Sequence, residues 1–489
     1  MGSAVIVQLY DISKFFDRES LRDGLNSIFQ YGVTGKLYRL LYHLNKDTRI
    51  SVKNAIGCSD PIITGENIGQ GTQEGAIISA ANIDFTVNKY FKTSADELSY
   101  GNINLQPLLF QDDITRISTS IKSAQSGNIR MEWAMESKLL DFNLDKSSLM
   151  IIGPKNRKNE LLKELDDNPV LLCKQKMKIA SKEKLLGDII SSNGLADSAK
   201  ATVDNRKWKV ISSIVEIRAV VEDYRSNLLG GIVTGLEIWE LSFIPFLLYN
   251  SETWTDLSKE TLNTLNDLQL KFYRTILSVP RTCPTPALLW ETGGWLMEHR
   301  IALRKLLFFH HLIHLPKQSL AYQIANVQHT LGYPGLVGEC NILLELYGIT
   351  VRPEELSKVH WRKLCKKMIL NKNKIDILEK AKKYKKISYD EMKKESFEVK
   401  SYLKDLSLSD AKLKFAIRTK MVRTIQANFK GEQQYKSNNW KCVGCGKLDT
   451  QEHVLGCSAY KHLREGRCLD NDKELVRYFR SVISMRESQ

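Results

Sequence analysis

The sequence lacks the long apolar segments that a membrane protein requires. None of its 489 residues belongs to an uncharged apolar stretch of about 20 residues, the length that spans a bilayer. The N-terminus also lacks the charged start, apolar core and cleavage site of a signal peptide. Hydrophobic residues make up 43% of the chain and charged residues 26%, as in soluble globular proteins. We therefore expect an intracellular protein with no membrane partner.

A disulfide framework and the familiar nucleotide-binding loops are also lacking. The nine cysteines are mostly scattered singly, which favours a reducing compartment. A glycine-rich loop at 65–75 precedes a helix predicted from near Ala76, but its spacing matches neither the dinucleotide nor the P-loop pattern. Glycines in such a loop allow a backbone or a phosphate to approach closely; those of this loop are Gly65, Gly69, Gly71 and Gly75.

Positive charge is present in excess. The chain has 71 Lys and Arg against 56 Asp and Glu, which gives a formal net charge of +15. This balance favours a polyanionic partner, with nucleic acid first and an anionic membrane second. Lysine is densest at 354–404, which we interpret either as a solvated helix face or linker, or as a surface that contacts a phosphate backbone. The length predicts roughly two to four domains.

The first apolar segment ends in an acid. Residues 4–10 are apolar on both faces and predict a buried strand, and Asp11 follows directly. A carboxylate at the end of a buried strand is a common feature of α/β active sites. Asp11 is equally consistent with a helix N-cap for the segment that follows.

Two adjacent aspartates form the most informative stretch. Asp112 and Asp113 lie between the apolar run 105–110 and the β-prone run 114–117, which predicts a tight hairpin with both carboxylates at its tip. Adjacent carboxylates repel each other, and a divalent cation held by oxygen ligands relieves that repulsion. A polar turn without a cation is the alternative, since Asp is common in turns.

The remaining patterns alternate between strands and helices. They predict helices at 20–30, 35–44 and 120–142, strands at 49–55 and 149–152, a turn at 143–148, a hairpin at 184–190, and helices over 199–314 with a loop at 280–286. This mixture indicates an α+β fold.

The C-terminal tail carries a metal-binding pattern. A pair of cysteines two residues apart is followed by a His and a third Cys, a soft-ligand set suited to one tetrahedral zinc ion: Cys442, Cys445, His453 and Cys457. Because protein would fill all four positions, we expect a structural site. Cys468 is a spare ligand. We expect zinc removal to unfold only this tail.

In order and spacing, these motifs resemble those of reverse transcriptases of non-LTR (LINE-like) retrotransposons. Residues 11–17 (DISKFFD) resemble the first palm motif, 72–79 (TQEGAIIS) the Q-G-x-x-L-S-P motif, and 110–113 (FQDD) the F-A-D-D box. Residues 143–148 are similar to the N-x-x-K-T/S turn and 185–187 to the primer-grip hairpin. Residues 247–254 and the segment after Val279 resemble the thumb region, and the Cys/His tail resembles the motif that ends many such polyproteins.

The resemblance implies an RNA-directed DNA polymerase with four parts. These are a palm at 1–195, an antiparallel sheet with packed helices; a helical thumb-like region at 196–350; a basic helical connector at 351–435; and a zinc-binding tail at 436–489. The implied partners are template RNA, a DNA primer or target DNA, deoxynucleotides and other parts of the polyprotein. The implied location is a ribonucleoprotein of the nucleus and cytoplasm.

The resemblance also assigns roles to individual residues. Asp11, Asp112 and Asp113 would be the catalytic acids, with Asp11 and Asp112 holding two Mg²⁺ or Mn²⁺ ions. The nucleotide would be bound by Phe16, whose ring would exclude a 2′-OH, and by three further residues, Gln73, Gly75 and Lys146. From position alone, a core role for Phe16 is an equal alternative.

The sequence departs from the family at several positions. Glu74 stands where the family has Gln, so we assign the glutamine role to Gln73 with the register shifted by one; Gln111 and Ala80 replace a small residue and a proline. No fingers segment precedes the first palm motif, so we expect the C-terminal portion of a polyprotein. Two alternatives remain: a catalytically inactive or domesticated nucleic-acid-binding remnant, and a zinc-binding interaction protein.

Overall fold

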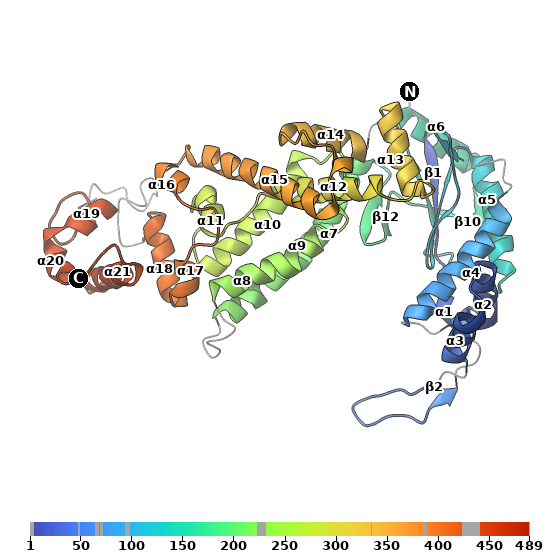
Figure 1. Cartoon of the computed structure of the whole chain (residues 1–489), viewed down its shortest axis with the longest axis horizontal. Coiled ribbons are helices and arrows are strands. Elements are labelled where there is room, and N and C mark those ends of the chain that lie inside the picture. The colour runs from blue at the N-terminus through green and yellow to red at the C-terminus, as the bar shows by residue number, and fades with distance from the viewer. Residues whose placement is uncertain are drawn as a thin grey trace. The chain divides into compact units, whose positions relative to one another are not determined.

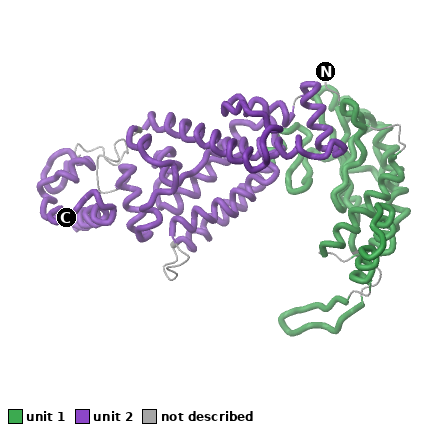
Figure 2. The backbone as a smooth tube through the Cα atoms, in the orientation of Figure 1, with its two compact units in different colours: residues 1–201 green, residues 202–489 purple. Residues whose placement is uncertain are grey.

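The computed structural model is a helix-rich α+β protein with small sheets. It describes residues 4–46, 49–63, 68, 72–92, 98–222, 231–333, 335–384, 389–422 and 441–488. The chain divides into two compact units, which we call unit 1 (residues 1–201) and unit 2 (residues 202–489) (Figure 2). The predicted division into four parts stays a prediction. Among the described residues, no helix is long and apolar enough to cross a membrane.

Unit 1 is built on a five-stranded sheet with the order β11-β8-β1-β7-β6. The central strand β1 (Val5–Tyr10) pairs antiparallel with β7 (Asp113–Ser118) on one side and with β8 (Ser148–Ile152) on the other. β6 (Leu108–Phe110) continues the antiparallel pattern, and β11 (Lys178–Ile179) pairs parallel with β8. The strands predicted at 4–10 and 149–152 are thus confirmed.

Both faces of β1 are covered, which explains why its sequence is apolar throughout. Ile6 and Tyr10 belong to a large core with α4 (Gln73–Phe91) and α5 (Ile121–Glu136). Val7 and Leu9 face the other way, into a small core that includes Leu185 and Ile190 of the β12–β13 hairpin. This hairpin, β12 (Lys182–Leu185) and β13 (Asp188–Ser191), confirms the one predicted at 184–190.

Figure 1 shows the β2 hairpin projecting away from this sheet, beyond α3, among the other elements of unit 1. They are α1 (Phe15–Arg18), α2 (Leu21–Gln30), α3 (Gly35–Asn45), α6 (Lys155–Asp167), β2 (Arg49–Ile50), β3 (Ile62–Ile63), β4 (Leu98–Tyr100), β5 (Ile103–Leu105), β9 (Leu171–Leu172) and β10 (Gln175–Lys176). The helices predicted at 20–30 and 35–44 are confirmed.

Three predicted boundaries are wrong. The helix predicted to reach residue 142 ends at Glu136, because Leu139 takes a left-handed conformation and Phe142 pairs with Ile12. The strand predicted at 49–55 is only the two residues of β2. The helix predicted from near Ala76 begins at Gln73, where Thr72 caps it. Gly65, Gly69 and Gly71 lie outside the described residues.

Unit 2 is helical, as the periodicity predicts. Its first half holds α7 (Leu195–Glu222), which begins in unit 1, then α8 (Ile232–Ile238), η1 (Trp239–Phe243), α9 (Ile244–Leu247), η2 (Ser251–Thr253), α10 (Lys259–Leu277), α11 (Thr285–Glu291) and α12 (Met297–Ile313). Its second half holds α13 (Leu320–Leu331), α14 (Leu336–Leu346), η3 (Pro353–Glu355), α15 (Lys358–Ala381), α16 (Tyr389–Lys394), α17 (Tyr402–Asp405), α18 (Leu408–Arg418), α19 (Gln451–Gly456), η6 (Ser458–Tyr460), α20 (Lys461–Arg464) and α21 (Asp472–Glu487).

The lysine-rich segment is an ordered helix over much of its length. α15 buries Trp361, Cys365 and Ile369 in a core shared with α12 and exposes Lys366 and Lys367. This is the arrangement of a solvated helix face, and it leaves those lysines accessible to a polyanion.

Candidate functional site

The two aspartates lie at a tight hairpin turn, as predicted. β6 and β7 are joined by Gln111 and Asp112, and Phe110 pairs with Asp113 across the turn. Gln111 adopts a left-handed conformation with φ of 56°, which two-residue hairpin turns commonly require. This geometry places Asp112 at the tip and Asp113 at the first position of β7.

Strand register brings Asp11 to the same end of the sheet. Tyr10, the last residue of β1, pairs with Ile114 of β7, so Asp11 and Asp113 are the next residues of the two neighbouring strands. The predicted turn at 143–148 braces Asp11: the Asn143 N–H donates to the Asp11 carbonyl (2.8 Å), and the Asp11 N–H donates to the Ser147 hydroxyl (3.1 Å).

Two cavities meet at Asp11. One of about 470 Å³ is lined by Asp11, Asp112, Phe16 and Lys146, together with Ser13 and Asn143. The other, of about 320 Å³, is lined by Asp11 and Asp113 and also by Asp145, Ser148, Lys178, Glu183 and Lys184. Asp11 is thus the one acid of the three that lines both cavities.

The charges at this site are unbalanced. Burial raises the pKa of Asp113, and the negative charges of Asp112 and Asp11 raise it further. The nearest cation is Lys146, whose Nζ lies 3.8 Å from Asp11 Oδ2 while its side chain remains 69% exposed. Carboxylate oxygens with unrelieved repulsion are the ligand type that Mg²⁺ prefers, so the residues fit such an ion. The three acids do not bring their oxygens together into a group that could hold an ion as it stands. Among the described residues, the group that does so is the Cys/His cluster of the C-terminal tail.

The remaining predicted nucleotide-site residues are only partly brought together. Phe16 is half-buried, packs edge-to-face on Phe15 at 5.2 Å, and lines the cavity that holds Asp11 and Asp112. Gln73 and Gly75 lie in the first turn of α4, where the Gly75 N–H donates to the Thr72 hydroxyl (3.1 Å). Neither lines the two cavities.

Two polar residues near the site were missed by sequence reasoning. Glu19 is buried and accepts hydrogen bonds from Ser79 and from Asn82 Nδ2 (2.8 Å), which fastens α4 to the segment after α1; burial raises its pKa. Ser148 is buried and lines the smaller cavity, and its hydroxyl has no hydrogen-bond partner among the described residues. A single sequence offers no signal for either, because their surroundings come from distant segments.

The Cys/His tail forms a compact ligand cluster. The ligand atoms of Cys442, Cys445, His453 and Cys457 all lie within 4.8 Å of one another. Cys457 Sγ lies 3.9 Å from Cys442 Sγ and 3.6 Å from Cys445 Sγ, and His453 Nε2 lies 3.2 Å from Cys445 Sγ. Two sulfur ligands of a tetrahedral zinc ion lie about 3.8 Å apart, so the cluster fits that ion.

A polar network supports this cluster. Tyr460 and Arg486 approach Cys442 Sγ, each at 3.7 Å, and Arg486 pairs with the buried Asp449 (2.8 Å). Burial by itself would raise the pKa of the Cys442 thiol, but hydrogen bonds from His453 and Tyr460 lower it to about 6. The resulting thiolate is the form that binds metal.

No protein-family model and no curated protein matches this chain. Solved structures of telomerase do match it. Telomerase from Candida albicans, in complex with a TWJ fragment of telomeric RNA, is 11% identical with a TM-score of 0.28, and the match covers 67% of this chain and 50% of that one. Telomerase from Candida tropicalis matches in the same kind of complex (10% identity, TM-score 0.29, 67% and 49%) and in its apo form (10%, 0.28, 66% and 53%). The chain spans about half the length of each.

Proposed function

We propose that unit 1 is the palm of an RNA-directed DNA polymerase of the non-LTR retrotransposon class. The observation that carries the proposal is that Asp11, Asp112 and Phe16 line one cavity, while Asp113 lies beside Asp11 on the neighbouring strand. Motifs that are 100 residues apart in the sequence thereby meet at one end of one sheet. The order of the motifs supports the reverse-transcriptase assignment.

Asp11 and Asp112 would hold two Mg²⁺ or Mn²⁺ ions, and Asp113 would be the third acid. When bound, such ions activate a primer 3′-OH and stabilise the charge on the leaving pyrophosphate. Lys146 lines the same cavity as Phe16 and is largely exposed, so its ammonium group is accessible to the phosphates of an incoming nucleotide. Gln73 and Gly75 would contact the nucleotide–template pair from the start of α4.

Phe16 would select the sugar. Its ring packs against Phe15 on one side and lines the cavity on the other, so it is held in place by the core. A rigid ring beneath the sugar would clash with a 2′-OH and favour deoxynucleotides.

The helical part of unit 2 would bind nucleic acid, and a zinc ion would stabilise the C-terminal tail. We propose a thumb and a basic connector in unit 2, and one structural Zn²⁺ held by Cys442, Cys445, His453 and Cys457, since protein fills every ligand position. We also propose that template RNA, a DNA primer or target DNA and deoxynucleotides are the partners, in an intracellular ribonucleoprotein.

Single-turnover incorporation of one deoxynucleotide on an RNA template tests the proposal. Asp11→Asn removes a proposed metal ligand and should abolish incorporation, whereas Asp167→Asn, the same change at an exposed position of α6, should leave it intact. Equal rates in the two variants would contradict the assignment. No incorporation by the unaltered chain, with RNA binding retained, would favour the nucleic-acid-binding remnant.

A further inference from the structure

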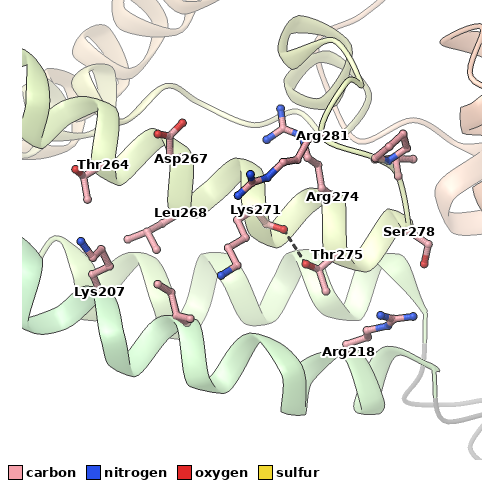
Figure 3. A pocket seen from close by; sticks show the side chains of 13 residues that line it. Lys207, Arg218, Thr264, Asp267, Leu268, Lys271, Arg274, Thr275, Ser278 and Arg281 are labelled. Atoms are coloured by element: carbon pink, nitrogen blue, oxygen red, sulfur yellow. Dashed lines mark hydrogen bonds between the residues drawn. The ribbon is translucent and has the colours of Figure 1, made fainter. Parts of the chain in front are cut away.

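A basic groove in unit 2 lies outside the site described above. It has a volume of about 920 Å³ and is formed by α7, α10 and the segment that follows α10 (Figure 3). Five cationic side chains line it, against a single carboxylate, that of Asp267: Lys207, Arg218, Lys271, Arg274 and Arg281. Sequence reasoning gave this helical region no chemical role.

Several of these cations have no acid to balance them. Within the described residues, Lys271, Arg274 and Arg281 form no ion pair, and Arg274 Nε is buried without a hydrogen-bond partner. Among the described residues, the guanidinium of Arg274 otherwise reaches the Thr285 hydroxyl, at 3.4 Å. Converging cations repel each other unless an anion lies between them. The groove therefore has the charge of a polyanion site.

The shape of the groove favours an extended anion. Lys207 and Arg218 are eleven residues apart on α7, which separates them by about 16 Å along the helix. Figure 3 shows them at opposite ends of the α7 wall, with Lys271 and Arg274 projecting from the α10 wall. A single phosphate would meet only part of this row of cations, whereas a chain of phosphates would meet all of it.

Flanking helices make a duplex a poor fit. The major groove of B-form DNA is about 12 Å wide and accepts one inserted helix, and the major groove of an RNA duplex is too narrow for side chains to read, whereas here two helices enclose a hollow. A single strand can lie in such a hollow with its backbone along the cations, as in grooves that bind single strands without sequence preference.

An exposed aromatic residue lies beside the groove. Trp208 is 67% exposed, and Lys207 Nζ, from the groove wall, lies 5.5 Å from the centre of its ring. An exposed indole next to a row of cations is the combination that single-strand-binding proteins use to stack a base.

We propose that this groove binds a single-stranded nucleic acid, with its phosphates on Lys271, Arg274, Arg218 and Arg281 and a base stacked on Trp208. Binding uses phosphate and base contacts only, so it needs no divalent metal. The inference does not rest on the polymerase proposal, because every residue in it belongs to unit 2.

Fluorescence anisotropy with a labelled RNA single strand of about 12 nucleotides, measured in EDTA, tests the proposal. The double variant Lys271→Ala/Arg274→Ala should bind at least tenfold more weakly, since it loses two charge-assisted contacts. The slope of log K against log salt should fall by about 1.4, the value for two phosphates of a single strand. The matched control Lys163→Ala/Lys317→Ala removes the same charge from two exposed positions and should stay within about twofold of the unaltered chain.

A second pair of variants tests the stacking contact. Trp208→Ala should weaken binding about tenfold, and Trp133→Ala, which removes an exposed tryptophan of unit 1, should not change it. Circular dichroism confirms that each variant is folded, and Lys271→Arg/Arg274→Lys should bind like the unaltered chain.

An equal loss of RNA affinity in the groove variant and in the control variant would contradict the proposed site. Binding of an RNA duplex as tightly as a single strand of equal length would overturn the ligand class. DNA single strands in the same assay show whether the 2′-OH contributes, and either result is compatible with a backbone groove. Asp11→Asn should bind as the unaltered chain does in EDTA, so failure of the polymerase proposal would leave this result intact.

Discussion

Asp113 is a destabilising residue at neutral pH in the absence of a cation. Its pKa is raised in the folded chain by burial and by the charges of Asp112 and Asp11. The folded state therefore holds the proton more tightly than the unfolded state, and stability falls as pH rises through the two pKa values. The resulting loss of folding stability is fully present at pH 7.

We predict that Asp113→Asn stabilises unit 1 at pH 7 in EDTA. The gain should be less than about 1 kcal/mol, because the carboxylate is partly solvated and its interactions are screened. Chemical denaturation measures it, and the difference should shrink at pH 3, where the carboxylate of the parent chain is protonated. A variant less stable than its parent at pH 7 would contradict the electrostatic account.

Phe16→Val should raise ribonucleotide incorporation relative to deoxynucleotide incorporation. The smaller side chain removes the ring that lines the cavity with Asp11 and Asp112. The ratio of kcat/KM for the two nucleotides is the measurement. Phe15→Leu, which alters the buried neighbour, is the control and should change stability more than selectivity. Unchanged selectivity in an active Phe16→Val enzyme would refute the sugar-gate role.

At the residue scale, the local sequence predicted the positions of side chains that lie at strand ends or in turns. Asp11, Asp112 and Asp113 each lie where an apolar run of the sequence ends, which predicted a strand end at Asp11 and a hairpin at the other two. The structure has both. Their catalytic roles stay predictions. Glu19 and Ser148 were not predictable, because the environment of each is assembled from segments far apart in the chain.

The Cys/His tail shares a core with the helix that precedes it, α18. Ile417 and Leu413 of α18 pack in one cluster with Cys442, Cys457 and Val454. Gln451 Nε2 donates to the Ile417 carbonyl (2.6 Å). α18 and the tail thus share one hydrophobic core.

Loss of zinc should therefore loosen α18 as well as 441–488. We predict that Cys457→Ser increases amide hydrogen exchange in both regions, because a structural zinc ion supplies much of the folding energy of a small module. Cys468→Ser, at an exposed cysteine outside the cluster, should change neither. Exchange confined to 441–488 would restore the simpler expectation that only the tail depends on zinc.

Arg418 joins α18 to the helices before it. Its guanidinium bonds to Glu291 (2.9 Å) and Glu395 (2.7 Å). Burial opposes the charge, but the two acids outweigh it and raise the pKa of Arg418. Arg418→Met should cost about 3 kcal/mol in chemical denaturation, because it leaves the buried Glu291 carboxylate without its cation. Glu395, in contrast, keeps Lys400 (2.7 Å). Arg477→Met, at an exposed pair on α21, should cost less than about 1 kcal/mol.

At the scale of elements, hydrophobic patterns predicted the helices α2 and α3 and the strands of the sheet except β11. Boundaries set by tertiary contacts were not predictable: α5 ends early because residues 139–142 turn back to pair with Ile12. The basic groove could not be predicted for the same reason, since its cations come from α7, α10 and the segment that follows α10.

For the whole molecule, the proposed catalytic site and the proposed single-strand groove are assigned to different units. Composition predicted a polyanionic partner from the net charge of +15 but could not say where it binds. The acids gather in unit 1, while the groove and the lysines of α15 lie in unit 2. Substitution of an acid should therefore change turnover and leave metal-free RNA binding unchanged.

Extension of a DNA primer on an RNA template in Mg²⁺ tests the central claim most directly. The unaltered chain should extend the primer, EDTA should stop the reaction, and Asp112→Asn should reduce extension by a factor of at least about 10³ while RNA binding persists. Extension that survives in Asp112→Asn, or none from the unaltered chain under conditions where it binds the template, would contradict the claim that these acids form a polymerase active site.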